Sequence, residues 1–143
     1  MDYFTLSNIK DVASILSSLG VIFAVFTFYK NNQLKKAEWL KSLFEKFYES
    51  NNYKEVRRWI DFNAIEEELG NDIDGQKEEK FADFLNFFEF IAVLEKINQL
   101  DVKKIRYLFA YYLKLIDENN FCRKYIKENG YKNLNKFLEK YDF

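Results

Sequence analysis

The longest apolar stretch of the chain runs over residues 12–29, and no charged side chain occurs in it. A helix rises about 1.5 Å per residue, so this stretch would reach roughly 27 Å, close to the thickness of a membrane's hydrocarbon core. A buried core helix is the alternative, but such helices rarely run this far without a charge. The pattern predicts one transmembrane helix, and the balanced charges of the preceding residues argue against a cleaved signal peptide.

Basic residues gather on the C-terminal side of this stretch. Lys30, Lys35 and Lys36 follow it, whereas only Lys10 and the amino terminus precede it. Because positive residues stay on the cytoplasmic side of a membrane, we expect a single-pass topology with the N-terminus outside. Residues 31–143 would then lie in the cytoplasm, with the lysines and Trp39 at the level of the lipid headgroups.

At 100° per residue the apolar stretch divides into three helical faces. The first carries small residues, which allow two helices to approach closely in lipid and predict a helix–helix interface: Ala13, Ser17, Gly20, Ala24 and Thr27. The second carries large apolar residues suited to lipid tails: Ile15, Leu16, Leu19, Ile22, Phe23 and Phe26. The third is polar at its ends and apolar in its middle, and would line a pore: Ser14, Ser18, Val21, Val25, Phe28 and Asn32.

The third face allows two interpretations. In a ring of helices, Val21, Val25 and Phe28 would form a hydrophobic constriction that gates by dewetting. Alternatively, the serines bond to carbonyls of their own helix, and the helix is a simple anchor. The pattern of the helix alone favours an anchor or a dimer over a pore.

The rest of the chain keeps a helical spacing of apolar residues. The pattern predicts that the membrane helix continues to residue 48, and that further helices occupy residues 53–69 (kinked or restarted near 61–63), 77–99 and 102–117, followed by two short ones. Residues 70–76 form the clearest loop, and Asp101 is a good N-cap. Since no strand pattern occurs, we expect an all-α chain, with the tail and membrane helix in residues 1–30 and a cytoplasmic helical bundle in residues 31–143.

The composition of this 143-residue chain limits the kinds of catalytic, metal and binding site that it can form. It contains no proline and no histidine, so long helices are favoured, and histidine-based triads, zinc sites and general bases are excluded. The single Cys122 cannot form an internal disulfide and fits a reducing cytoplasm. A net charge of −1 gives no general attraction to nucleic acid, so no stable DNA binding is expected. We predict no catalytic residue, metal or cofactor.

One group of polar residues stands out from the apolar helices. Asn86 and Glu89 share a face of a helix too apolar to leave a carboxylate unpaired. The structural interpretation, which we favour, pairs Glu89 with Arg57, Arg58 or Arg106 and so fixes the helix packing. The alternative is a small polar pocket for a ligand or for the tail of a partner.

Several short motifs carry a resemblance: the segments YKEVRRWID and FLNFFEFIAVLEKINQLD after the membrane helix. In this order they resemble a family of small bacterial membrane-anchored proteins, a domain of unknown function, and less specifically the membrane accessory protein of type VI-B CRISPR systems. The latter resemblance implies a homo-oligomeric inner-membrane pore in antiviral defence. It also implies a divergent HEPN helical domain, whose ribonuclease members need an arginine followed shortly by histidine, a pattern that this chain lacks.

These observations lead to two hypotheses. The first is a homo-oligomeric pore of the bacterial inner membrane that dissipates the membrane potential, with other copies of the chain, membrane lipid and a CRISPR effector complex or its RNA product as partners. The second is a membrane-tethered cytoplasmic helical module that senses a ligand or partner without forming a pore. A hydrolase or nuclease ranks lowest, because no acid–base constellation is present.

Overall fold

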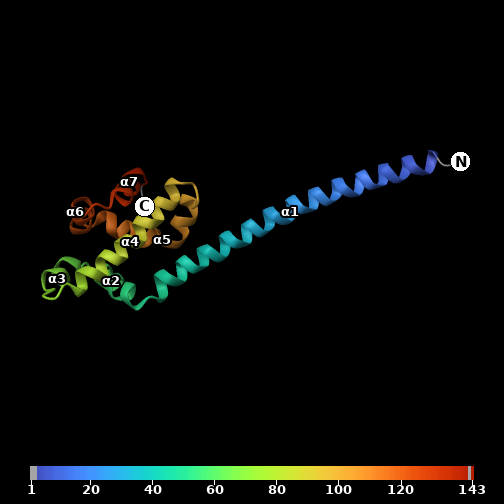
Figure 1. Cartoon of the computed structure of the whole chain (residues 1–143). Helices are drawn as coiled ribbons and strands as arrows, with labels where there is room; N and C mark the ends of the chain where they lie inside the picture. The colour runs from blue at the N-terminus through green and yellow to red at the C-terminus, as the bar shows by residue number, and fades with distance from the viewer. Residues whose placement is uncertain (1–2, 142) are drawn as a thin grey trace. The chain divides into compact units, whose positions relative to one another are not determined.

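The computed structural model describes the backbone of residues 3–141 and 143, and the side chains of residues 23–141 and 143. Within this part of the chain, seven helices and no strand occur (Figure 1). They are α1 (Tyr3–Glu49), α2 (Asn51–Asp61), α3 (Ile65–Gly70), α4 (Gln76–Lys96), α5 (Val102–Glu118), α6 (Asn120–Glu128) and α7 (Lys132–Lys140). The predicted all-α class is confirmed.

Helix α1 is a single helix of 47 residues, about 70 Å at the usual rise. It contains the uncharged stretch and continues to Glu49, as the unbroken helical spacing predicts. Ser50 then begins the next helix, because its extended backbone and its side-chain oxygen cap the N–H of Tyr53 at 3.5 Å. The break between the two helices is therefore shorter than the four polar residues 49–52 suggest.

The chain forms two compact units, Met1–Leu43 and Phe44–Phe143. The first consists of most of α1, and the second is a helical bundle that includes the last turns of α1. From the sequence we placed a domain boundary after residue 30, where the uncharged stretch ends. The two boundaries describe different properties, since one marks a change in polarity and the other marks where the packed core begins.

Helix α4 occupies the centre of the bundle, as its apolar character predicts. Eight of its side chains are buried: Phe81, Phe84, Leu85, Phe87, Phe88, Ile91, Ala92 and Leu94. Phe90 departs from this pattern, since 47% of it is exposed. Helices α2 and α7 both pack against α4, so its buried residues serve more than one helical neighbour.

The core is built largely from aromatic rings, and Phe47 of α1 lies in its middle. Phe47 is fully buried. Rings from α2, α4 and α5 surround it at centroid distances of 5.2–6.2 Å: Tyr53, Phe84, Phe87, Phe88, Phe109 and Tyr112. Such tilted, edge-on and stacked pairs are favourable beyond the apolar area that they bury. The end of α1 is thus part of the hydrophobic core.

Local sequence signals explain where the remaining helices begin and end. Of the kink or restart predicted near residues 61–63, the structure shows the restart, in which Asn63 adopts a left-handed φ of 52° before α3 begins. Asp101 caps α5 as predicted, since its Oδ1 accepts the N–H of Lys103 at 2.8 Å. Asn119 caps α6 in the same way, and Gly130 provides the positive φ between α6 and α7.

Candidate functional site

The apolar side chains of α1 over residues 23–29 are largely exposed. The exposed fraction is 63–71% for Phe23, Val25, Phe26, Phe28 and Tyr29. At 100° per residue these five positions span about 220° of the helix circumference, and the remaining sector carries Ala24 and Thr27. A single packing partner covers only one face, so this segment requires an apolar environment on several sides.

Among the residues that the structure describes, no helix combines the length and apolarity needed to cross a membrane. The predicted transmembrane helix is therefore not found within that part of the chain. The side chains of residues 12–22, which make up the first part of the predicted span, lie outside the described residues.

The structure describes only some of the side chains that we predicted for the helix–helix interface and the pore lining. Ala13, Ser14, Ser17, Ser18, Gly20 and Val21 lie outside the described side chains. Of the others, Ala24, Val25, Phe28 and Asn32 are exposed, and Thr27 is half-buried. Their assignment to an interface or a pore lining stays a prediction.

Lysines follow the apolar side chains on α1. Lys30, Lys35 and Lys36 are exposed, and Trp39 is half-buried one turn further along. Between Lys30 and Ala37 the only charged residues are these three lysines. The helix thus changes from an apolar segment to a positively charged one within a single turn.

In the bundle, Arg57 of α2 binds the C-terminal end of α1. Its side chain is 8% exposed, and its guanidinium donates to the carbonyl oxygen of Phe47 and, at 3.0 Å, to that of Tyr48. The guanidinium carbon also lies 5.2 Å from the ring centroid of Phe47 and 5.4 Å from that of Tyr48. The last carbonyls of a helix lack partners within the helix, so a buried arginine satisfies them and complements the helix dipole.

Glu89 of α4 caps a different helix. Its Oε1 accepts from the N–H and the side-chain amide of Asn133, at 3.1 and 2.7 Å, and its Oε2 accepts from the N–H of Leu134 at 2.7 Å. These groups lie in the first turn of α7, where N–H groups lack helical partners and a negative charge is favourable. Glu89 therefore attaches α7 to the central helix.

The predicted polar cluster is thus divided between separate networks. We expected Glu89 to pair with an arginine, but its described hydrogen bonds lead to α7, while those of Arg57 lead to α1. Arg58 and Asn86 are exposed, and the guanidinium of Arg106 lies 5.5 Å from the ring centroid of Phe143. The described contacts do not join these five residues into one ligand pocket.

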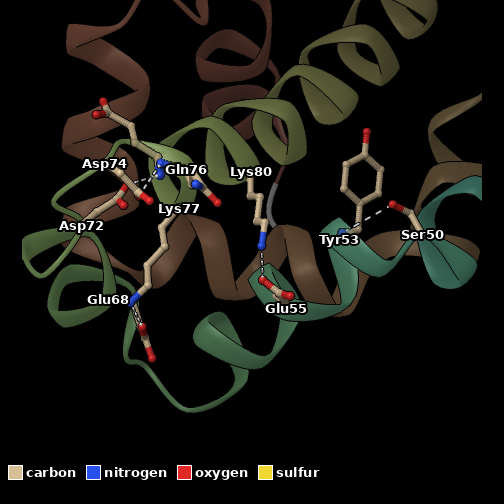
Figure 2. Close-up of polar contacts among 10 residues, drawn as sticks. Ser50, Tyr53, Glu55, Glu68, Asp72, Asp74, Gln76, Lys77 and Lys80 are labelled. Carbon is tan, nitrogen blue, oxygen red and sulfur yellow. Dashed lines mark hydrogen bonds and ion pairs between the residues drawn. The ribbon is translucent and has the colours of Figure 1, made fainter.

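The acidic loop before α4 also has a structural role (Figure 2). Asp72 accepts the N–H of Glu78 at 2.7 Å, and Asp74 accepts that of Gln76 at 3.2 Å. Desolvation acts to raise the pKa of Asp72, but hydrogen bonds, including the one from Glu78, lower it below its usual value. The two aspartates thus cap the start of α4.

Ion pairs connect the same part of the bundle, as Figure 2 shows. Lys77 of α4 binds Glu68 of α3 at 2.6 Å, and Lys80 binds Glu55 of α2 at 2.5 Å. Both pairs are partly exposed, and such pairs contribute little to stability. They orient three helices rather than form a reactive site.

A hollow of about 240 Å³ between α4 and α7 contains three lysines, Lys96, Lys136 and Lys140. Lys96 donates to Asn133 at 3.1 Å, and Lys140 binds Glu95 at 3.0 Å. Both lysines lie in the last turn of their helix, where a positive charge complements the helix dipole. Helix capping and pairing therefore account for two of these charges without a ligand.

Cys122 is a core residue. It is fully buried, and burial raises the pKa of its thiol to about 12. Because the thiolate is the reactive form, this cysteine is inert at neutral pH.

Comparisons with known proteins give no further guide, since no protein-family model, curated protein or solved structure matches the chain. The resemblance drawn from the sequence motifs therefore remains a hypothesis.

Proposed function

We propose that the chain is a single-pass membrane protein in which α1 anchors a helical bundle at the cytoplasmic surface of a bacterial inner membrane, and that it acts by binding and assembly rather than by catalysis. One observation carries this proposal: the exposed apolar side chains that cover more than half of the circumference of α1 over residues 23–29 and are followed directly by lysines. Lipid surrounds a membrane-spanning helix and so supplies the apolar environment that these exposed side chains require. The uncharged sequence of residues 12–22 extends the same segment to the length of a span.

The contacts of the bundle support a role in binding and assembly. The notable polar residues Arg57 and Glu89 cap helices, and the aspartates of the acidic loop do the same. Side chains committed to helix ends are not available as general acids or bases. The bundle is then a rigid domain that α1 holds at the membrane, where it senses a ligand or partner.

The anchor is tested by placing charges in it. In the double variant Phe23→Arg/Phe26→Arg, the remaining apolar residues 12–22 reach only about 16 Å, too short to cross the hydrocarbon core. We expect the wild-type chain to stay in membranes washed with alkaline carbonate and the variant to be released. The matched control Phe62→Arg/Tyr107→Arg changes two exposed aromatic residues of the bundle and should stay bound. Release of the wild-type chain would contradict the proposal.

Topology is tested with cysteine labelling in a Cys122→Ala background. A cysteine introduced at Asn8 should react with a membrane-impermeant reagent added from outside the cell. One introduced at Lys127, which is exposed on α6, should react only after the membrane is opened. The reverse pattern would show that the lysines do not set the orientation as proposed.

A homo-oligomeric pore is the second candidate. Val25, Phe28 and Asn32 fall on one face of α1 and are exposed, which leaves that face available to line an axis. Self-association would come from the stripe of small residues, because small side chains let helices approach closely in lipid. The resemblance to the CRISPR accessory protein would then assign such a pore to antiviral defence, with an effector complex or its RNA product as the trigger.

The pore candidate has its own test. Ala24→Leu places a large side chain in the small stripe and should reduce the oligomer mass in mild detergent, whereas Phe26→Leu on the lipid face should not. Val25→Ser makes the proposed constriction more polar and should raise ion conductance in liposomes. A monomer in detergent together with unchanged conductance would exclude the pore and leave the membrane-anchored binding module as the proposed function.

A further inference from the structure

We propose that Lys30, Lys35 and Lys36 form a collar around α1 that binds the anionic headgroups of phospholipids. All three side chains are exposed. At 100° per residue, Lys35 lies about 140° and Lys36 about 240° around the helix from Lys30, so the three ammonium groups point to all sides. They occupy about 9 Å along the axis, similar to the depth of a headgroup layer. This inference rests on the proposed anchoring of α1.

The arrangement of the lysines identifies the kind of partner. A helix that lies on a membrane surface carries its lysines on one polar face. A nucleic acid or an acidic protein likewise approaches a helix from one side. Charges that encircle the axis instead match a helix that passes upright through a layer of negative groups, and a leaflet of anionic phospholipids surrounds the helix in this way.

The neighbouring residues fit the same environment. The residues between the lysines are neutral, and the first acidic residue after Lys30 is Glu38. Trp39, one turn beyond, is half-buried and amphipathic, as is common at the level of headgroups. Each lysine near an anionic membrane surface favours binding about fivefold, so three together should enrich anionic lipids strongly around the helix.

Lipid enrichment can be measured with a tryptophan at the hydrocarbon boundary as the reporter. The chain has two tryptophans, so the variant Tyr29→Trp/Trp39→Phe/Trp59→Phe carries a single one, directly before Lys30. This full-length variant is placed in phosphatidylcholine vesicles that contain the same minor fraction of either brominated phosphatidylglycerol or brominated phosphatidylcholine. We expect brominated phosphatidylglycerol to quench this tryptophan at least about twofold more, and high salt to reduce the difference.

Charge removal tests the role of the collar itself. When Lys30→Gln/Lys35→Gln/Lys36→Gln is added to the reporter variant, the two brominated lipids should quench its tryptophan equally. The control Lys103→Gln/Lys104→Gln/Lys127→Gln removes three exposed lysines of the bundle and should keep the preference for the anionic lipid.

Two outcomes would contradict the inference, and they differ. Suppose that the protein with its three lysines intact resists carbonate extraction, but both lipids quench the tryptophan equally. The inference that the lysines bind anionic lipid is then wrong, and the proposed anchor stands. If neither lipid quenches the reporter tryptophan and carbonate releases the protein, the anchor fails and the collar fails with it.

Discussion

Arg57 and Arg58 are adjacent in sequence and have opposite environments. Helix α2 turns by 100° per residue, so Arg57 enters the core beside Phe47 while Arg58 stays exposed. The buried guanidinium is compensated by the two carbonyls of α1 and by the aromatic rings around it. A single residue of α2 therefore satisfies two of the last carbonyls of α1.

This pair allows a matched test of what the buried arginine contributes. We expect Arg57→Gln to lower the free energy of unfolding by about 2–3 kcal/mol, because two buried carbonyls lose a charged donor. Arg58→Gln should change it by less than about 0.5 kcal/mol. Chemical denaturation of the full chain in mild detergent, followed by circular dichroism, measures both. Equal effects of the two substitutions would show that the contacts of Arg57 to α1 do not stabilise the bundle.

The sequence singled out Arg57 and Arg58 together, and it identified neither which of them is buried nor what the buried one binds. An arginine in a helix with apolar neighbours suggests a buried charge, and a carboxylate is the obvious candidate to pair with it. The observed acceptors are backbone carbonyls of Phe47 and Tyr48, which every residue type carries. Only the three-dimensional position of the end of α1 shows which carbonyls lack helical partners.

At the scale of elements, α7 depends on a residue of another helix for its N-terminus. Its own N-cap position, Tyr131, provides no side-chain hydrogen bond, and Glu89 of α4 takes over this function. A helix of nine residues has little stability by itself, so this external cap and the burial of its apolar face keep it in place.

We therefore expect Glu89→Ala to weaken α7 locally. Loss of a cap costs about 1 kcal/mol, and loss of a negative charge at a helix N-terminus adds to this. Hydrogen exchange followed by mass spectrometry should show faster exchange in α7 and little change in α5. Glu128→Ala, at an exposed position on α6, is the control. If α7 exchanges at the wild-type rate in the Glu89 variant, its apolar packing alone holds it.

Helix boundaries could be predicted from the sequence where a local signal marks them. Asp101 and the loop at residues 70–76 provide such signals, and the structure confirms both. The cap of α7 could not be predicted in this way, since Glu89 and Asn133 are far apart in sequence and meet only after the helices pack. The side-chain cap formed by Ser50 was missed as well, because four polar residues in a row looked like a longer loop.

At the scale of the whole molecule, buried tyrosines predict a sensitivity to alkaline pH. Burial, together with the charge of Asp61, raises the pKa of Tyr112 to about 12, and burial raises the pKa values of Tyr48 and Tyr53 in the same direction. In the unfolded chain the pKa of tyrosine is about 10. The unfolded state therefore loses protons first, so stability is full below pH 10 and decreases as the pH rises from 10 towards 12.

The measurement is the melting temperature of the full chain as a function of pH, compared between two variants. Tyr112→Phe should flatten the decrease above pH 10, whereas Tyr107→Phe, which removes a hydroxyl from a ring that is 90% exposed, should follow the wild-type curve. Parallel curves for both variants would show that Tyr112 is not responsible for the alkaline sensitivity.

The position of Phe47 determines where the anchor can be detached. This core residue belongs to α1, so a protease that cuts the exposed helix between residues 30 and 38 would release a bundle that keeps its central ring. A cut at Ser50 would remove the ring, and the loss of a buried phenylalanine costs about 3–5 kcal/mol, a large share of the stability of a small domain. Shedding of an intact bundle from the membrane is thus compatible with cleavage before Phe47 and not with cleavage after it.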